Sequence, residues 1–271
     1  MGWIARRKLA AAVCNAGGLG IIETSSGEIE NCIEEIKAMP KLTDQPFGVN
    51  LPLMFLADDR MVNIVADAGV KFVTTSAGDP SKYIQILKDA NITVFHAVPS
   101  LKGALKAVDA GVDGLVVEGT EGGGFKASEE VGLHVLIQSI KKHTDIPIVA
   151  AGGIVDGRGM AAAFAAGAEG IQMGTRFVSS LESPVHNNYK NKIIESSEEG
   201  TFILNKKGRP CIRALKSNLT EEIYEKGVMD MSALGGIKNL YFEGDMEAAP
   251  ALAGQSIGLI DEVKPVKNII E

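Results

Sequence analysis

Cysteine, aromatic residues and long apolar runs are all scarce in this sequence. Its 271 residues include three cysteines, and only 5% of its residues are aromatic. Cys14, Cys32 and Cys211 lie far apart without metal-ligand spacing, so we expect free thiols in a reducing compartment and no metal site. No stretch approaches the roughly 20 apolar residues of a membrane span. The opening segment MGWIARRKLAAAV is typical of an amphipathic helix rather than a signal peptide, so we expect a cytoplasmic protein.

Basic charge is also in short supply. The chain has 27 lysine and arginine residues against 34 aspartate and glutamate residues, which gives a formal net charge of -7. This balance argues against a nucleic-acid partner. Glycine is abundant at 31 residues, and 45% of the chain is hydrophobic. That composition fits a sizeable core with many tight turns between strands and helices.

Short apolar runs alternate with helical patterns along most of the chain. This alternation is typical of repeated βα units and of a parallel sheet whose strands are buried on both faces. The expected strands are 18–22, 47–50, 72–76, 93–98, 114–118, 147–151 and 170–173. The expected helices include 58–68, 81–90, 130–141, 185–197 and 219–227.

A closed barrel of βα units needs eight strands, and only seven are expected here. Because the chain opens with a helical pattern, we predict an α/β fold, a TIM (β/α)8 barrel that lacks its first strand at the N-terminus. A misplaced start or a fragment would explain this, and an open doubly wound sheet is the alternative. The βα rhythm stops after residue 177. We therefore expect a barrel over 1–177, a helical lid over 178–250 and a return to the barrel, with its last helix, over 251–271.

Two glycine turns follow the last two expected strands, in AAGGIVDGRG and QMGTRF. Loops at the carboxyl ends of the final barrel strands are the usual phosphate site. Glycine lets backbone N–H groups approach an anion closely. We predict that Gly152, Gly153, Gly174 and Thr175 hold a phosphate group. The alternative is that these glycines only form tight turns.

Polar residues end three other strands. Asn50, Thr75 and Glu118 would surround whatever is attached to the phosphate. Mixed polar groups above an apolar barrel suit a flat heteroaromatic ring with hydrogen-bonding edges, and a flavin fits this description. Each residue taken alone could equally be a satisfied polar group at a strand end.

Six motifs occur in an order that resembles the nitronate monooxygenase family, formerly called 2-nitropropane dioxygenases. They are GGLGII, PFGVN, VTTSAGDPSKY, VEGTEGGGF, PIVAAGGIVDGRG and QMGTRF. The same motifs resemble the flavin-dependent enoyl-acyl-carrier-protein reductases, enoyl-ACP reductase II among them, and the NADH:quinone reductases. The resemblance covers nearly the whole chain and implies an FMN-binding TIM barrel with a helical lid.

This resemblance also implies which residues bind the cofactor. Met1 and Gly2 are similar to the tail of a Gly-Met segment that ends the family's first strand and touches the flavin. With the phosphate on the glycines named above, the other expected cofactor-binding residues are Met1, Gly2, Asn50, Thr75, Glu118, Gly123 and Met173. Where the family often has Gln, this chain has Glu118, as in the reductase branch.

Family members typically carry His after the triple glycine, where it acts as a base or orients the substrate. This chain has Phe125 there, and an apolar ring cannot accept a proton. His96, Lys126 and His186 are candidates to replace it, so the catalytic residue stays open. The alternative for His96 is a hydrogen-bonded histidine at the strand end, and the alternative for Lys126 is a solvated lysine. Nitronate oxidation tolerates this loss because a nitronate is already deprotonated. Neutral nitroalkanes would then be poor substrates.

These observations favour an FMN-dependent oxidoreductase that oxidises alkyl nitronates with molecular oxygen. The alternative is an NAD(P)H-dependent FMN reductase acting on a quinone or an enoyl thioester, and a non-catalytic phosphate-binding barrel is a third reading. The expected partners are a nitronate and oxygen, with NAD(P)H use left open and no nucleic acid or membrane. The oligomeric state is also left open, with a homodimer as one alternative.

Overall fold

A computed structural model describes residues 1–56 and 59–271 of the chain, and Asp58, the first residue of one expected helix, lies outside the described residues. The chain divides into two compact units. Unit 1 comprises Met1–Val117, Ser139–Val149 and Pro265–Glu271, and unit 2 comprises Glu118–Gln138 and Ala150–Lys264. This division differs from the three segments expected from the sequence, because unit 2 begins inside the region expected to form the barrel.

Seven strands form one sheet in the order β1-β2-β3-β4-β5-β7-β8. Their bounds are Ile21–Glu23 (β1), Gly48–Pro52 (β2), Phe72–Ser76 (β3), Thr93–Val98 (β4), Gly114–Glu118 (β5), Ile148–Ala151 (β7) and Gly170–Gln172 (β8). Strands β1 to β5 pair in parallel, each with the next along the chain. The α/β barrel class and the seven strands of this sheet are therefore confirmed. Three of the expected strands have the predicted bounds and the others are within a few residues.

The strands of unit 1 have two chemically different faces. Val49, Leu51, Val73 and Val94 are buried in one apolar core together with side chains of the neighbouring helices. Because successive side chains of a strand point to opposite faces, Asn50 and the residues in register with it lie on the other face of the sheet. The sequence of β2 therefore places a polar group on the face away from the helices.

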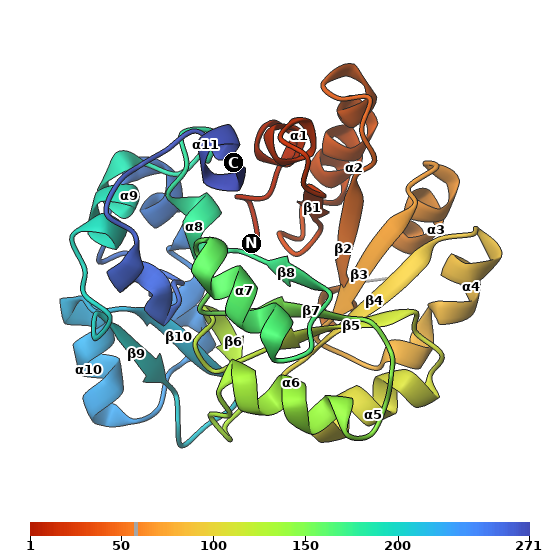
Figure 1. The fold of residues 1–271 in the computed structure, drawn as a ribbon. Coiled ribbons are helices and arrows are strands. Elements are labelled where there is room, and N and C mark those ends of the chain that lie inside the picture. The colour runs from red at the N-terminus through yellow and green to blue at the C-terminus, as the bar shows by residue number, and fades with distance from the viewer. Residues whose placement is uncertain (57–58) are drawn as a thin grey trace. The chain divides into compact units, whose positions relative to one another are not determined.

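Helices cover the apolar face of β1 to β4, as Figure 1 shows for α2, α3 and α4. The α-helices of unit 1 are Arg7–Asn15 (α1), Ile29–Ala38 (α2), Arg60–Asp67 (α3), Ile84–Asp89 (α4), Leu101–Asp109 (α5) and Val266–Ile270 (α11). Its 3-10 turns are Met39–Lys41 (η1), Leu53–Phe55 (η2) and Pro80–Lys82 (η3). In α3, Met61, Val62 and Val65 recur at helical spacing and enter the core. In the described part of the chain, no helix is long and apolar enough to cross a membrane.

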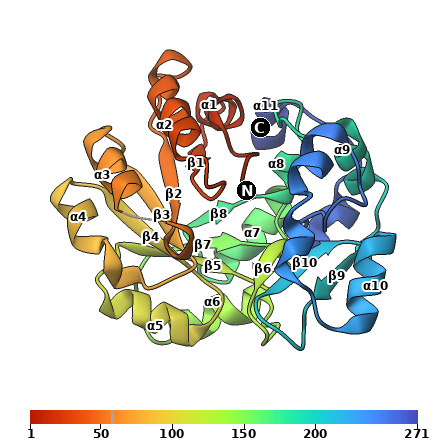
Figure 2. The same ribbon diagram turned by 180° about the vertical axis from the view of Figure 1, so that it is seen from behind.

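Unit 2 contains a second, antiparallel sheet in the order β6-β10-β9 (Figure 2). Its strands are Gly124–Lys126 (β6), Thr201–Leu204 (β9) and Cys211–Leu215 (β10). The other elements of unit 2 are Gly157–Ala165 (α7), Thr175–Val178 (α8), Asn187–Ile194 (α9), Asn218–Lys226 (α10), Met231–Leu234 (η4), the π-helix Asn239–Glu243 (η5) and Gln255–Leu259 (η6). Helix α6 (Leu133–Lys141) begins in unit 2 and ends in unit 1.

The segment expected to be a helical lid is therefore only partly helical. Helices α9 and α10 confirm the two expected helices, but β9 and β10 lie between them. These strands have only four and five residues, and β10 pairs with β6, which is distant in sequence. Such non-local pairing leaves little local signal, which explains why the sequence pattern missed it.

Candidate functional site

Asn50 forms a polar cluster with the strand next to it in unit 1. Its Nδ2 donates to Thr74 Oγ1 at 2.9 Å, to the Thr74 carbonyl oxygen at 3.2 Å and to Ser76 Oγ at 3.4 Å. The pairing of Asn50 with Thr74 in the parallel register brings these groups together. The bonds fix the orientation of the Asn50 amide. Contact between Asn50 and a cofactor stays a prediction.

Thr75 does not join the Asn50 cluster, because neighbouring side chains of a strand point to opposite faces. Its Oγ1 lies 2.7 Å from His96 Nδ1, and both residues are buried. The Thr75 side chain and Asn50 therefore point to opposite faces of the sheet, and Thr74 and Ser76 share the face of Asn50. The alternation within VTTS was the signal for this that sequence analysis passed over. Contact between Thr75 and a cofactor stays a prediction.

His96 matches its structural alternative, a hydrogen-bonded histidine at a strand end. Burial lowers the pKa of His96 to about 4, and the nearby Asp79 carboxylate only partly offsets this effect. The imidazole is therefore neutral near pH 7. Its bond to Thr75 and its burial leave it poorly placed to exchange protons with a ligand.

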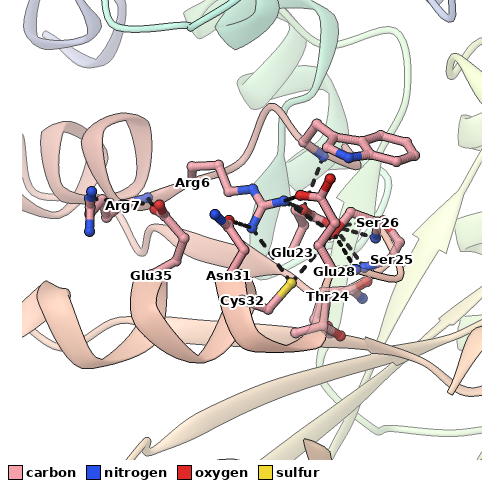
Figure 3. Close-up of polar contacts among 12 residues, drawn as sticks. Arg6, Arg7, Glu23, Thr24, Ser25, Ser26, Glu28, Asn31, Cys32 and Glu35 are labelled. Carbon is pink, nitrogen blue, oxygen red and sulfur yellow. Dashed lines mark hydrogen bonds and ion pairs between the residues drawn. The ribbon is translucent and has the colours of Figure 1, made fainter. Parts of the chain in front are cut away.

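Glu23 is a buried carboxylate that sequence analysis did not single out. It ends β1, is in register with Asn50 and is 1% exposed. Its Oε2 accepts hydrogen bonds from Ser25 N at 2.7 Å, Ser25 Oγ at 2.9 Å and Ser26 N at 3.1 Å (Figure 3). Its Oε1 accepts one from Trp3 N at 3.0 Å. A buried carboxylate is tolerated only with such partners.

Arg6 provides the positive charge beside Glu23, with Nη2 at 2.9 Å from Glu23 Oε1. The same nitrogen lies 3.3 Å from Glu28 Oε2, and Nη1 donates to Asn31 Oδ1 at 2.6 Å (Figure 3). Cys32 Sγ lies 3.6 Å from Nη1, but burial raises the pKa of this thiol, so it stays protonated. Arg6 thereby ties the segment before α1 to β1 and α2.

Met1 and Gly2 lie at the end of this tied segment. A Cβ added at Gly2 would be 3.0 Å from Ser25 Oγ, so the backbone runs close to the loop that follows β1. The amide of the next residue, Trp3, donates to Glu23. The expected contact of Met1 and Gly2 with a flavin stays a prediction.

In unit 2, the glycine loop (residues 119–124) is fastened at several points. Gly119 N donates to the Ala151 carbonyl oxygen at 3.0 Å. Arg213, which is 5% exposed, donates from Nε to the Thr120 carbonyl oxygen at 2.9 Å. The Glu121 carboxylate accepts from Leu133 N at the start of α6, at 3.0 and 3.1 Å. These bonds make the loop a preorganised element rather than a free linker.

Close chain packing explains Gly123. A Cβ at Gly123 would lie 2.5 Å from the Ala253 carbonyl carbon and 2.7 Å from Gly254 N. Gln255 N donates to the Glu121 carbonyl oxygen at 2.9 Å. The segment 253–255, expected to belong to the barrel's last helix, thus packs against the glycine loop instead. Ligand contact at Gly123 stays a prediction.

Glu118 and Lys126 form an ion pair at the two ends of the glycine loop. The Lys126 side chain is 3% exposed, whereas that of Glu118 is 33% exposed. Phe125, at the position where the resemblance implies His, is 41% exposed. Lys126 is therefore neither a free cation for a substrate nor the solvated lysine of the alternative, because its side chain is buried and its ammonium group binds Glu118.

Gly152 and Gly153 both have positive φ angles, of 97° and 77°. A Cβ at Gly152 would lie 2.9 Å from Gly122 N, so this turn packs on the glycine loop. Asp156 then caps α7 by accepting a hydrogen bond from Gly159 N at 2.9 Å. These conformations require glycine, and phosphate binding at this turn stays a prediction.

The second glycine turn lies at the start of α8. Met173 follows β8, Gly174 is the N-terminal cap and Thr175 is the first helical residue. Thr175 Oγ1 accepts a hydrogen bond from Gly254 N at 3.0 Å, so its side chain is already engaged within unit 2. The expected cofactor contacts of Met173, Gly174 and Thr175 stay predictions.

His186 is the N-terminal cap of α9. Its Nδ1 accepts a hydrogen bond from Asn188 N at 3.1 Å, and its backbone N donates to the Tyr241 carbonyl oxygen at 2.6 Å. An imidazole nitrogen used as a cap is not available as a base.

A model of the Nitronate monooxygenase family matches residues 1–59 and 53–271. The chain belongs to this family. Among curated relatives, it is 29% identical over 267 residues to a nitronate monooxygenase of Paraburkholderia phytofirmans, covering 81% of this chain and 73% of the relative. It is 34% identical over 232 residues to the (3aS,4S,5R,7aS)-5-hydroxy-7a-methyl-1-oxo-octahydro-1H-indene-4-carboxyl-CoA dehydrogenase of Rhodococcus jostii. That match covers 84% of this chain but only 64% of the relative.

Solved structures agree with the family assignment. FabK from Thermotoga maritima has a TM-score of 0.94 and 41% identity, covering 100% of this chain and 88% of that chain. A nitroalkane oxidase from Streptomyces ansochromogenes has a TM-score of 0.86 and 25% identity, covering 99% and 91%. Both likenesses agree with the α/β barrel class of the fold described above.

Proposed function

We propose that this protein binds FMN and oxidises anionic alkyl nitronates with molecular oxygen. One observation carries the choice of substrate: none of the four positions considered for proton transfer offers a free base. Phe125 is apolar and His96 is buried and neutral. The Lys126 ammonium is paired and buried, and the His186 imidazole caps a helix. A nitronate arrives without the proton that such a base would remove.

Several residues of unit 2 suit the phosphate end of FMN. Gly152 and Gly153 both have positive φ angles, a turn conformation in which successive backbone N–H groups can bind an anion. Thr120 Oγ1, in the glycine loop, is buried without a hydrogen-bond partner among the described residues. Its hydroxyl group is therefore available to donate a hydrogen bond to a ligand. Bound flavin would supply the electron acceptor and the group that reacts with oxygen.

The chain's own residues then have three tasks. The glycine turns hold the phosphate. Lys126 balances the charge of Glu118, which reduces the repulsion between this carboxylate and an anionic substrate. The exposed Phe125 ring offers apolar surface to an alkyl chain.

The test is anaerobic mixing of the FMN-loaded protein with propionate 3-nitronate, while the absorbance of oxidised flavin is recorded. We expect rapid loss of that absorbance with the nitronate and a far slower loss with 3-nitropropionate, which still carries its carbon-bound proton. NADH and NADPH are mixed separately. Loss of absorbance with a nicotinamide and none with the nitronate would overturn the proposal.

A reductase is the second candidate, and the resemblance to FabK favours it. Identity to FabK is 41%, against 25% to the nitroalkane oxidase. The Rhodococcus relative, of which this chain spans 64%, is named a carboxyl-CoA dehydrogenase. Glu118 also follows the reductase pattern. The same experiment separates the two functions, because a reductase needs NAD(P)H to reduce the flavin and a nitronate monooxygenase does not.

A further inference from the structure

Strand β6 separates Phe125 and Lys126 onto different faces. It pairs with β10 in an antiparallel register that places Phe125 opposite Ile212 and Lys126 opposite Cys211. Successive side chains of a strand point in opposite directions. Phe125 is accordingly 41% exposed, while the Lys126 side chain is 3% exposed. The residue next to the missing histidine therefore points inward, away from the exposed side of the strand.

The inward-pointing Lys126 ends on Glu118. Its Nζ contacts Glu118 Oε1, and the backbone of Gly122 passes beside both groups. A Cβ at Gly122 would lie 2.6 Å from that carboxylate oxygen and 2.7 Å from Nζ. Glycine is thus the residue type that leaves room for the ion pair. The ion pair therefore explains why residue 122 is glycine, rather than a tight turn alone.

The two members of the pair differ in their access to solvent. An ammonium group that is buried to this extent is costly without a counter-charge. Glu118 is the counter-charge, yet a third of its side chain stays exposed. One face of the carboxylate is therefore fixed by the protein, and the other is open to a ligand.

We propose that Lys126 is a positioning residue, which holds the Glu118 carboxylate in one orientation so that it accepts a hydrogen bond from bound FMN. This role rests on the proposed function only for the identity of the ligand. An ionised carboxylate is purely an acceptor, so Glu118 selects an N–H or O–H edge of the ligand. Lys126 acts through Glu118 and does not itself touch the reacting atoms.

The decisive experiment is a double-mutant cycle on FMN affinity, measured by quenching of FMN fluorescence. Lys126→Met should weaken FMN binding roughly tenfold, the size expected when one hydrogen bond to a charged group is disturbed. In a Glu118→Gln background the same change should alter affinity by less than about twofold, because there is no carboxylate left to position. Lys126→Arg should retain most of the affinity, since it keeps the charge.

Lys206→Met is the matched control, because Lys206 makes an exposed ion pair with Glu130 elsewhere in unit 2. It should leave FMN affinity unchanged. An equal loss from Lys126→Met with and without Glu118 would overturn the proposal, and so would no loss in either background. Both results would show that Lys126 does not act through Glu118.

A second cycle, on unfolding of the protein without FMN, separates this proposal from the proposed function. Glu118→Gln should lower the urea midpoint because it leaves the Lys126 ammonium buried without its counter-charge, and adding Lys126→Met should restore part of the loss. Additive effects would overturn the coupling. If the unaltered chain fails to bind FMN, the proposed function falls, while this cycle still decides whether Lys126 fixes Glu118.

Discussion

Glu23→Gln removes the charge from a carboxylate that is 1% exposed and that holds the segment before α1 in place. The wild-type oxygens accept from backbone and hydroxyl donors of Trp3, Ser25 and Ser26 and pair with Arg6. Glutamine keeps one acceptor oxygen. Its amide NH2 group is a hydrogen-bond donor, so it cannot accept the hydrogen bonds that one carboxylate oxygen of Glu23 accepts. The substitution preserves size, so the change in stability reports the charge and the hydrogen bonds.

The expected loss follows from the partners that remain. Breaking a buried ion pair by removing one partner costs about 3 to 5 kcal/mol. Arg6 keeps Glu28 and Asn31 as partners, so we expect the lower end, about 3 kcal/mol of unfolding free energy. Urea denaturation followed by circular dichroism measures it. In a protein of this size the melting temperature should fall by roughly 6 to 12 °C.

Glu28→Gln is the matched control, because the Glu28 side chain pairs with the same Arg6 but is 35% exposed. An exposed pair contributes at most about 1 kcal/mol. A loss below about 1 kcal/mol in Glu23→Gln, or equal losses in the two variants, would refute the argument that the Glu23 carboxylate anchors this segment.

Three further outcomes are expected. Gly152→Ala should cost roughly 1 to 3 kcal/mol of stability, because residue 152 has a positive φ and an added Cβ would meet Gly122 N. The variant should also lose FMN during gel filtration. Retention of FMN by a stable variant would contradict the phosphate site. The pKa of His96 is about 4 in the folded protein, below its unfolded value of 6.5. The folded state therefore favours the neutral ring. This contribution to stability is fully present above pH 6.5 and is lost as the pH falls towards 4. An NMR titration of His96 with a midpoint near 6.5 would refute it. Phe125→His should raise the oxidation rate of 3-nitropropionate roughly 100-fold, as general-base catalysis permits, with little change for the nitronate; equal changes for both substrates would argue against a role in proton removal.

The parallel strands were predictable because burial on both faces leaves a strong local signal. Runs such as TVFHAV and GLVVE are apolar enough to need no tertiary information, and β4 and β5 have the predicted bounds. Strands β6, β9 and β10 were not predictable in the same way. Each is short, and its pairing partner is chosen by tertiary structure rather than by the residues beside it.

The site shows the same limit at the level of single residues. A sequence displays that VTTS is polar, but which of its hydroxyl groups shares a face with Asn50 depends on register. Thr74 and Ser76, rather than Thr75, therefore share the face of Asn50. Glu23 was overlooked for a related reason: a lone glutamate after an apolar run is usually solvated, and only the fold shows that backbone donors and Arg6 surround it.

The packing of segment 253–255 on the glycine loop has a consequence for the order of folding. Gly123 leaves space that the Ala253–Gly254 backbone fills, and Gln255 N completes the hydrogen bonding of Glu121. These partners come from a late part of the chain, so local propensity cannot give the loop its final shape. A contact between segments so far apart closes a long stretch of chain and forms slowly. During synthesis, the glycine loop therefore reaches its native form only after nearly all of the chain has emerged.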